Sequence, residues 1–335
     1  MRTLLEPGLV NDSFGDPGLY VDFRDERRAL LFDLGDTSAL PPRKLMRLSH
    51  VFVTHTHMDH FAGFDHLLRV VLGRKPRLAI FGGPNFVSQV EHKLRAYTWN
   101  VVHRYEVPLD IDVYEVAPDG HGLRARFSSR RAFEREDSDD FNVTGDVLYD
   151  ETTFRVRGRF VDHDIQCLSY AVEEKAHVNV RKERIAELGF ATGAWLRDLK
   201  HAVLTGQPAD TAIDVRWRDR DGEHAVSRTV DELRDVILGV VPGRRLGYVT
   251  DLRYTGANVQ ALAEMLHGVD TLFIECVFLD ADREHATRKN HLTARQAGWI
   301  ARVIGPGSVV PFHFSPRYRG REAELVAEMT DAWKG

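Results

Sequence analysis

A dense group of histidines with one aspartate stands between a predicted strand and a predicted helix. The run Thr54-His55-Thr56-His57-Met58-Asp59-His60 has the pattern HxHxDH. In an extended segment, His55 and His57 project to the same side because side chains alternate along the chain. Asp59 and His60 follow where the helix begins, so they turn toward a second point. The spacing predicts two adjacent cations rather than one, and the alternative is a histidine-rich loop without metal.

Two cations need more ligands than one loop supplies, and three further residues stand at comparable places. Each residue stands at the end of a predicted strand: His163 follows Arg159-Phe160-Val161-Asp162, Asp251 follows Tyr248-Val249-Thr250 and His313 follows Val310-Pro311-Phe312. Strands that deliver ligands from their ends hold a site rigidly. Each residue alone is also compatible with a capped loop or a surface histidine. Together with HxHxDH, they predict a binuclear metal centre.

The elements that must position these residues are strands and helices in alternation. Strands are predicted at 29–32, 50–53, 78–81, 246–249, 272–277 and 309–312, where short apolar runs end at polar residues or glycine. Helices are predicted from 60 to about 71, through 259–266, after Thr293 and at 322–333, where apolar residues recur every three or four positions. Residues 100–170 alternate and are predicted to be mostly β. Sheets covered by helices in layers would result.

Composition narrows the class of protein. The chain has 335 residues, 43% of them hydrophobic and 28% charged, which is typical of a globular protein with a sizeable core. The net charge of −5 argues against a protein that coats nucleic acid. Without a predicted membrane span or signal peptide, and with only Cys167 and Cys276, the expectation is a cytoplasmic protein with buried thiols and no disulfide scaffold.

One segment interrupts the β pattern. Lys175 to His201 has six basic and three acidic residues, together with Gly189, Gly193 and the isolated Trp195. One interpretation is an arm or insertion that binds the substrate; the other is a solvated helix pair with scattered charge.

Further motifs identify a family. They are Leu31-Phe32-Asp33-Leu34-Gly35, His163 before Leu168-Ser169-Tyr170, Thr250-Asp251, Glu275 with Phe278, 291–297 (HLTARQA) and 313–318 (HFSPRY). With them, the chain resembles the metallo-β-lactamase-fold hydrolases, and among these ribonuclease Z, the endonuclease that processes tRNA 3′ ends. HxHxDH marks the superfamily, and the last two motifs indicate the ribonuclease Z branch. The resemblance spans about residues 29–320.

The resemblance implies a fold and a set of ligands. The fold is α+β, a four-layer αβ/βα metallo-β-lactamase sandwich, as a single domain over 1–335 with an arm-like insertion at about 175–225. One Zn²⁺ would be held by His55, His57 and His163, the other by Asp59, His60 and His313, with Asp251 bridging them. Mn²⁺ and Fe²⁺ suit the same nitrogen and oxygen ligands. Asp33 is expected to orient a ligand imidazole, although a simple turn residue is the alternative.

The reaction implied is hydrolysis of a phosphodiester in RNA by a metal-activated hydroxide. The resemblance implies that Asp59 is a catalytic residue as well as a metal ligand. Glu275 and His291 resemble an acid relay, in which the carboxylate orients the imidazole that protonates the departing ribose oxygen. Without the family, His291 is only a histidine near a helix cap. Arg317 is either a phosphate contact or part of a surface salt bridge.

The substrate machinery departs from the family. Residues 9–23 lack the Gly-rich turn and the Pro- and Arg/Asn-bearing loop that help ribonuclease Z to recognise tRNA. The segment 175–201 has Thr192-Gly193-Ala194 where the family arm carries a Gly-Pro pair, and Ile274 replaces a frequent histidine. A precursor tRNA is the first substrate hypothesis, and a small phosphodiester, cyclic nucleotide, ester or lactone is the alternative. A non-enzymatic RNA-binding subunit is disfavoured because all seven ligand positions are filled. The family leads us to expect a homodimer.

Overall fold

The computed structural model describes residues 4–24, 26–175, 177–219, 222–241 and 243–335. By its internal contacts the chain divides into two compact units. One unit comprises the chain up to Glu173 and from Arg244 onward, and the other comprises Glu174–Gly243. All the predicted metal ligands belong to the first unit.

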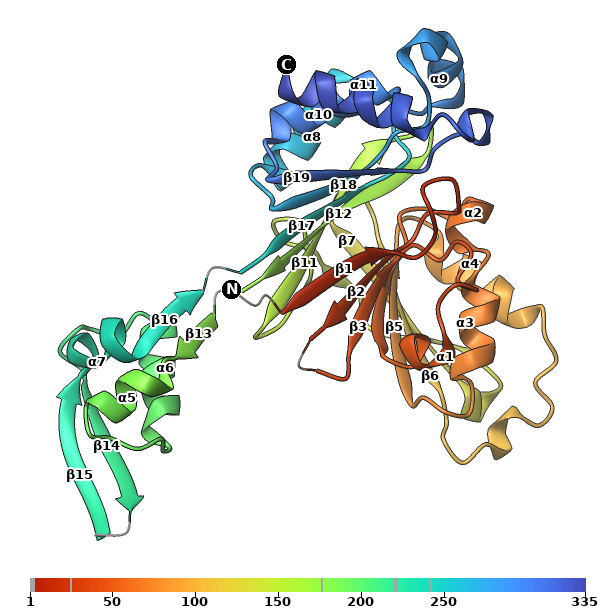
Figure 1. Cartoon of the computed structure of the whole chain (residues 1–335). Coiled ribbons are helices and arrows are strands. Elements are labelled where there is room, and N and C mark those ends of the chain that lie inside the picture. The colour runs from red at the N-terminus through yellow and green to blue at the C-terminus, as the bar shows by residue number, and fades with distance from the viewer. Residues whose placement is uncertain (1–3, 25, 176, 220–221, 242) are drawn as a thin grey trace. The chain divides into compact units, whose positions relative to one another are not determined.

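The first half of the larger unit folds into a mixed sheet (Figure 1). Its strands pair in the order β1 to β8, and β9 pairs with β7. The pairs from β3 to β6 are parallel and the others are antiparallel. The bounds are β1 (Leu5–Leu9), β2 (Leu19–Phe23), β3 (Ala29–Phe32), β4 (Leu48–Phe52), β5 (Arg77–Gly82), β6 (Asp110–Val116), β7 (His121–Ser128), β8 (Arg135–Asp137) and β9 (Phe141–Asn142).

The second half contributes another mixed sheet. Its order is β10-β11-β12-β17-β18-β19, with β17, β18 and β19 parallel to one another. The bounds are β10 (Val147–Asp150), β11 (Phe154–Asp162), β12 (Gln166–Glu174), β17 (Arg245–Val249), β18 (Thr271–Glu275) and β19 (Ser308–Phe312).

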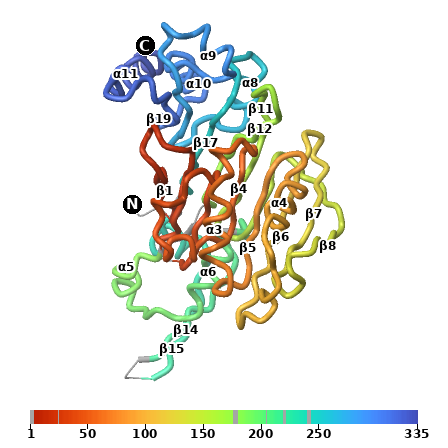
Figure 2. Tube along the Cα trace, turned by 90° about the vertical axis from the view of Figure 1, so that its right-hand side faces the viewer, coloured from red at the N-terminus to blue at the C-terminus, as the bar shows by residue number. Residues whose placement is uncertain are grey.

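Helices cover the outer face of each sheet, as the ribbon and the turned trace show (Figures 1 and 2). On the first sheet they are α1 (Pro42–Leu45), α2 (Met58–Phe61), α3 (Phe64–Val71) and α4 (Phe86–Arg95). On the second they are α8 (Gly256–Leu266), α10 (Ala294–Ile304) and α11 (Glu322–Lys334), with α9 (Arg283–Lys289) following β18. No helix within the described ranges is long and apolar enough to cross a membrane.

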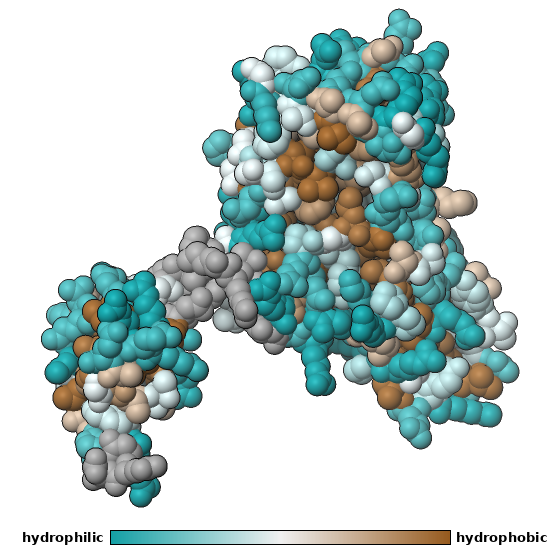
Figure 3. Space-filling model, viewed as in Figure 1, coloured by the Kyte–Doolittle hydropathy of each residue, from teal (hydrophilic) through white to brown (hydrophobic). Residues whose placement is uncertain are grey.

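The core of this unit has three layers of apolar side chains. Between the sheets, the rings of Phe32 and Phe52 pack against Tyr170 and Tyr248, all fully buried or nearly so. The outer layers join each sheet to its helices. On the face drawn in Figure 3, apolar side chains gather over the sheets, and hydrophilic ones cover most of the helical layer formed by α8 to α11. The arrangement is helix, sheet, sheet, helix, so the predicted four-layer α+β sandwich is confirmed.

The smaller unit has its own core. Trp195, Leu199, Val215 and Leu233 are buried together within it. Its strands form two antiparallel pairs, β13 with β16 and β14 with β15. The bounds are β13 (His177–Val180), α5 (Lys182–Glu187), α6 (Trp195–Leu204), β14 (Ala212–Asp219), β15 (Gly222–Thr229), α7 (Val230–Ile237) and β16 (Leu238–Val241). That this unit is an arm-like insertion in a single domain stays a prediction.

Most predicted elements are present, and one needs correction. The predicted helix from His60 to about Val71 is two helices, α2 and α3, which break at Ala62–Gly63. The backbone N–H of Gly63 donates to Leu34 O at 2.8 Å. A Cβ on Gly63 would lie 2.1 Å from Gly35 O, so position 63 has no room for a side chain beside the turn that follows β3. The helix breaks where the chain makes this close approach.

Candidate metal centre

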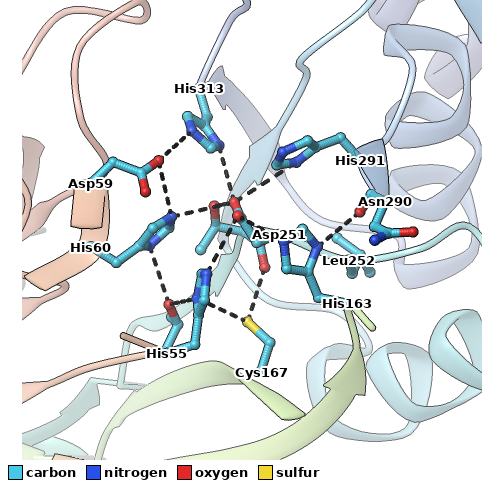
Figure 4. A network of polar contacts seen from close by, with 12 residues as sticks. His55, Asp59, His60, His163, Cys167, Asp251, Leu252, Asn290, His291 and His313 are labelled. Atoms are coloured by element: carbon cyan, nitrogen blue, oxygen red, sulfur yellow. Dashed lines mark hydrogen bonds and ion pairs between the residues drawn. The ribbon is translucent and has the colours of Figure 1, made fainter. Parts of the chain in front are cut away.

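Two of the predicted ligands, Asp251 and His313, lie where parallel strands end (Figure 4), and the predicted supporting residue Asp33 follows another such strand. Asp33 follows β3, Asp251 comes just after β17 and His313 follows β19. All three have a left-handed backbone, with φ of 61°, 50° and 59°. Non-glycine residues seldom adopt this conformation, and such strain is concentrated at functional sites. The turn after each strand directs its side chain into one shared space.

Asp251 stands at the centre of this space and divides the other ligands into two groups. Its Oδ2 lies 3.3 Å from His163 Nε2 and 3.6 Å from His55 Nε2, and the His57 ring lies 4.3 Å from that of His55, centre to centre. Ligand atoms of these four residues all lie within 4.8 Å of one another. His163, which follows β11, thus meets the motif that follows β4, although more than one hundred residues separate them.

The other carboxylate oxygen of Asp251 faces the second group. Oδ1 lies 3.1 Å from His313 Nδ1 and 3.5 Å from His60 Nε2. Asp59 Oδ2 lies 3.4 Å from His313 Nε2 and 3.6 Å from His60 Nε2. The seven residues therefore come together in two groups with the Asp251 carboxylate between them. Their assignment as ligands remains a proposal.

Hydrogen bonds behind the imidazoles fix the direction in which each ring points. His60 Nδ1 donates to Asp33 Oδ2 at 2.9 Å, so Asp33 contacts the imidazole of a candidate ligand, as predicted. His163 Nδ1 donates to the backbone oxygen of Asn290 at 2.9 Å. In both rings Nδ1 is engaged by this hydrogen bond, and Nε2 faces Asp251. Such outer partners commonly fix the tautomer of metal-binding histidines.

Sequence reasoning missed several of these supporting residues. Thr54 and Tyr248 donate hydroxyl hydrogen bonds to Asp33 at 2.9 and 3.0 Å. The thiol of Cys167 lies 3.6 Å from His55 Nδ1. Thr54 adjoins the HxHxDH pattern and Cys167 is the second residue of the buried strand β12, but neither residue type alone indicates such a role. Cys167 and Cys276 are buried as predicted, and burial raises the pKa of both thiols.

Imidazole nitrogens without hydrogen bonds and a buried negative charge make the centre suitable for divalent cations. Within the described part of the chain, three buried atoms, His55 Nε2, His60 Nε2 and His313 Nδ1, make no hydrogen bond. Burial lowers the pKa of His55 to about 2, which keeps its lone pair free for a cation. Burial also opposes the charge on His60, but Asp251 and Asp33 outweigh it and raise the pKa of His60 to about 10. The same buried negative charge would stabilise a bound cation.

The predicted relay residues lie beside the second group. Glu275 is fully buried and accepts hydrogen bonds from His291 Nδ1 at 2.8 Å and from the Leu292 N–H at 2.9 Å. Burial would lower the pKa of His291, but the Glu275 carboxylate outweighs it and raises that pKa. His291 Nδ1 is 4.0 Å from Asp251 Oδ1. Ligand atoms of Asp251, Glu275, His291 and His313 also lie within 4.8 Å, so geometry alone leaves a metal-binding role open to His291.

Two cavities border the centre. The relay-side cavity, of about 360 Å³, is lined by Phe14, Asp59, Phe278, Lys289, His291 and His313 among others. Arg317 stands near it, with Nη1 3.4 Å from Asp282 Oδ2. This ion pair matches the second of the two predictions for Arg317, and a phosphate contact stays a prediction. The other cavity borders His55.

Comparison with known proteins agrees with this architecture. A family model described as "Beta-lactamase superfamily domain" matches residues 196–314. The ribonuclease Z of Deinococcus radiodurans is 29% identical over 94% of this chain and 92% of its own length. That of Haloferax volcanii is 26% identical over 98% of this chain and 88% of its own length.

Solved structures show the same fold. The short form of human tRNase Z superposes with a TM-score of 0.52 at 16% identity, over 94% of this chain and 92% of its own. The metallo-β-lactamase fold protein YhfI of Bacillus subtilis gives 0.54 at 15% identity, over 100% and 95%. The fold and the His and Asp clusters indicate binding of divalent metal ions. The chain is a metallo-β-lactamase-fold hydrolase that resembles ribonuclease Z.

Proposed function

We propose that this protein is a binuclear-metal phosphodiesterase that cuts precursor tRNA at the 3′ end. One observation carries the proposal: seven ligand-type residues gather around Asp251, and the hydrogen-bonded pair of Glu275 and His291 lies beside them. The similarity to ribonucleases Z over nearly the whole chain supports RNA as the substrate. We propose Zn²⁺ as the metal, because imidazole and carboxylate ligands suit it.

When bound, two such cations activate water as a nucleophile and stabilise the charge that develops on the phosphate. The chain's own residues then have separable tasks. The seven ligands hold the cations, and Asp33 and the Asn290 carbonyl keep two of the imidazoles aimed inward. Glu275 holds His291 by Nδ1, which leaves Nε2 to donate a proton to the departing ribose 3′-oxygen.

The test compares two substrates. Zinc-loaded protein is offered a precursor tRNA and, separately, bis(p-nitrophenyl) phosphate, and the ends of the RNA products are mapped. We expect a single cut at the end of the acceptor stem that leaves a 3′-hydroxyl on the tRNA. An Asp251→Ala variant purified in the same way controls for contaminating nucleases. Turnover of the small diester without cleavage of the RNA would refute the tRNA assignment and leave only the diesterase.

One observation favours the alternative, a small-molecule hydrolase of the same fold. The turn between β1 and β2 borders the relay-side cavity through Phe14, Gly15 and Asp16. Residues 9–18 include Asp12 and Asp16 and no lysine or arginine, so this part of the wall repels a polyanion. The same experiment decides between the two functions.

The oligomeric state belongs to this proposal as well. We propose a homodimer because ribonuclease Z commonly forms one. Light scattering coupled to size-exclusion chromatography should give twice the chain mass of 38.1 kDa. A monomer at micromolar concentration would contradict it.

A further inference from the structure

The cavity that borders His55 is lined by amide groups. Its volume is about 310 Å³, and its walls include Asn85, Gln89 and Gln166, together with Thr56, Pro84 and Ile165. This volume is at the lower end of the range for small-molecule sites. No aspartate, glutamate, lysine or arginine lines it, whereas the relay-side cavity has Asp16, Asp59 and Lys289 in its wall.

The three carboxamides have free hydrogen-bonding capacity. Within the described residues, the side chains of Asn85, Gln89 and Gln166 make no hydrogen bond. Each offers an N–H₂ donor and a carbonyl acceptor. A phosphate would require cationic or N–H-only partners, so this wall suits a neutral ligand that has donors and acceptors side by side. Pro84 and Ile165 add apolar surface against which a flat ring can pack.

The backbone holds these groups in place. Asn85 has a left-handed φ of 70° and begins α4, and Gln89 lies one turn later on the same face, with its N–H bonded to Asn85 O. Gln166 begins β12 directly before Cys167, whose thiol lies 3.6 Å from His55 Nδ1. A Cβ on Gly83 would lie 3.3 Å from the Phe160 ring, so this glycine allows the loop to pass close to the second sheet.

The position of the cavity relative to Asp251 suggests what occupies it. His55 faces Oδ2 of Asp251, whereas His313 and His291 face Oδ1 and border the relay-side cavity. The nucleoside that departs through its 3′-oxygen must reach His291. The nucleoside that retains the phosphate on its 5′-oxygen therefore extends from the other side of the centre, where the amide cavity lies.

We propose that the amide cavity binds the nucleobase of the nucleotide that retains the cleaved phosphate, the first nucleotide of the released fragment. The inference rests on the proposed function. Asparagine and glutamine pair through two hydrogen bonds with a base edge that presents a donor beside an acceptor, and adenine matches them best. The cavity would thus make cleavage depend on the base that follows the cut.

The experiment uses nucleoside 5′-monophosphates, which carry the retained phosphate and one base. Calorimetry measures the Kd of zinc-loaded protein for AMP, GMP, CMP, UMP and ribose 5-phosphate, which lacks a base. We expect AMP to bind at least ~10-fold more tightly than ribose 5-phosphate, the gain from one good bidentate contact. In the Gln89→Ala/Gln166→Ala double variant, this ratio should fall to within about 2-fold.

Two further variants sharpen the test. Asn85→Gly removes one amide and tolerates the left-handed backbone, and it should lower the ratio in part. Gln260→Ala removes an exposed amide on α8, far in sequence from the cavity wall, and should leave the ratio unchanged. Equal affinity for all five ligands in the wild type, or a ratio that survives the double variant, would overturn the proposal. Because binding is measured without turnover, a failure to cleave precursor tRNA would count against the proposed function and not against the cavity.

Discussion

His291 is the residue whose replacement best separates a proton relay from a third metal-binding position. In the relay, His291 contributes no metal bond, so His291→Ala should retain the metal content of the wild type. The change removes one of the hydrogen bonds to the buried Glu275 carboxylate, but the Leu292 N–H at 2.9 Å still supports it. The fold should therefore survive.

The size of the effect depends on the leaving group. A ribose 3′-oxygen departs as a strongly basic alkoxide, and loss of its general acid should lower kcat by roughly 10² to 10⁴, which corresponds to about 3–5 kcal/mol of barrier. A p-nitrophenolate departs readily without a proton, so its loss should be less than about 10-fold. Glu275→Gln should show the same substrate pattern more weakly, because the amide still fills the space but no longer fixes the imidazole by charge.

The assay has two readouts on each protein. Single-turnover cleavage of precursor tRNA and turnover of bis(p-nitrophenyl) phosphate are measured beside elemental analysis for zinc. His267→Ala, an exposed histidine at the end of α8, is the matched control. Equal losses on both substrates, or zinc content lowered only in His291→Ala, would refute the relay and assign His291 to the metal cluster that the geometry also permits.

Three further predictions concern the bridge, the smaller unit and a distant histidine. Asp251→Ala should lower metal content to less than one ion per chain, because both groups lose a carboxylate oxygen; two retained ions by elemental analysis would contradict the bridge. Replacing 174–243 by a short turn should raise KM for precursor tRNA at least ~10-fold and spare small-diester turnover, since a loss of phosphate contacts weakens binding; an unchanged KM would show that the unit does not bind RNA. Burial, with help from nearby cations, lowers the pKa of His50 to about 4, so the unfolded chain takes up its proton first as pH falls below 6.5. The free energy of unfolding should then drop by up to about 3 kcal/mol between pH 6.5 and 4 relative to His50→Phe, as urea melts at several pH values would show, and parallel curves would disprove it.

The sequence predicts most strands of the larger unit, and that the candidate ligands come together, for a physical reason. A buried parallel strand is a continuous apolar run, so its end can be recognised in the sequence, and Asp251 and His313 both follow such strands. His163 instead follows β11, an antiparallel strand in which buried and more exposed residues alternate. The break between α2 and α3 at Gly63 cannot be predicted from the local sequence, because it results from a contact with Gly35, almost thirty residues earlier. Gln89 and Gln166 line one cavity only because the two halves of the unit pack together, and glutamine carries no local signal of function.

In the smaller unit, the charge of one segment gives a wrong impression of the charge of the unit. The basic excess of 175–201 is real, but the unit 174–243 has eleven Lys and Arg residues against twelve Asp and Glu residues. Residues 202–243 carry the acidic excess. If this unit binds RNA, we expect the phosphate contacts to come mainly from residues 175–201.

Charge pairing limits that contact further and sets a measurable bound. Of the six basic residues in 175–201, Arg184 pairs with Glu187 at 2.6 Å and Arg197 lies 3.8 Å from Asp198. Each phosphate that is neutralised contributes roughly 0.7–0.9 to the slope of log K against log salt. Removing the unit should therefore lower the magnitude of that slope for precursor tRNA by no more than about 5, and by less if the paired arginines stay paired. A larger change, measured by filter binding between 50 and 200 mM salt, would mean that cations outside this stretch contact the RNA and that the predicted basic arm is not its main docking site.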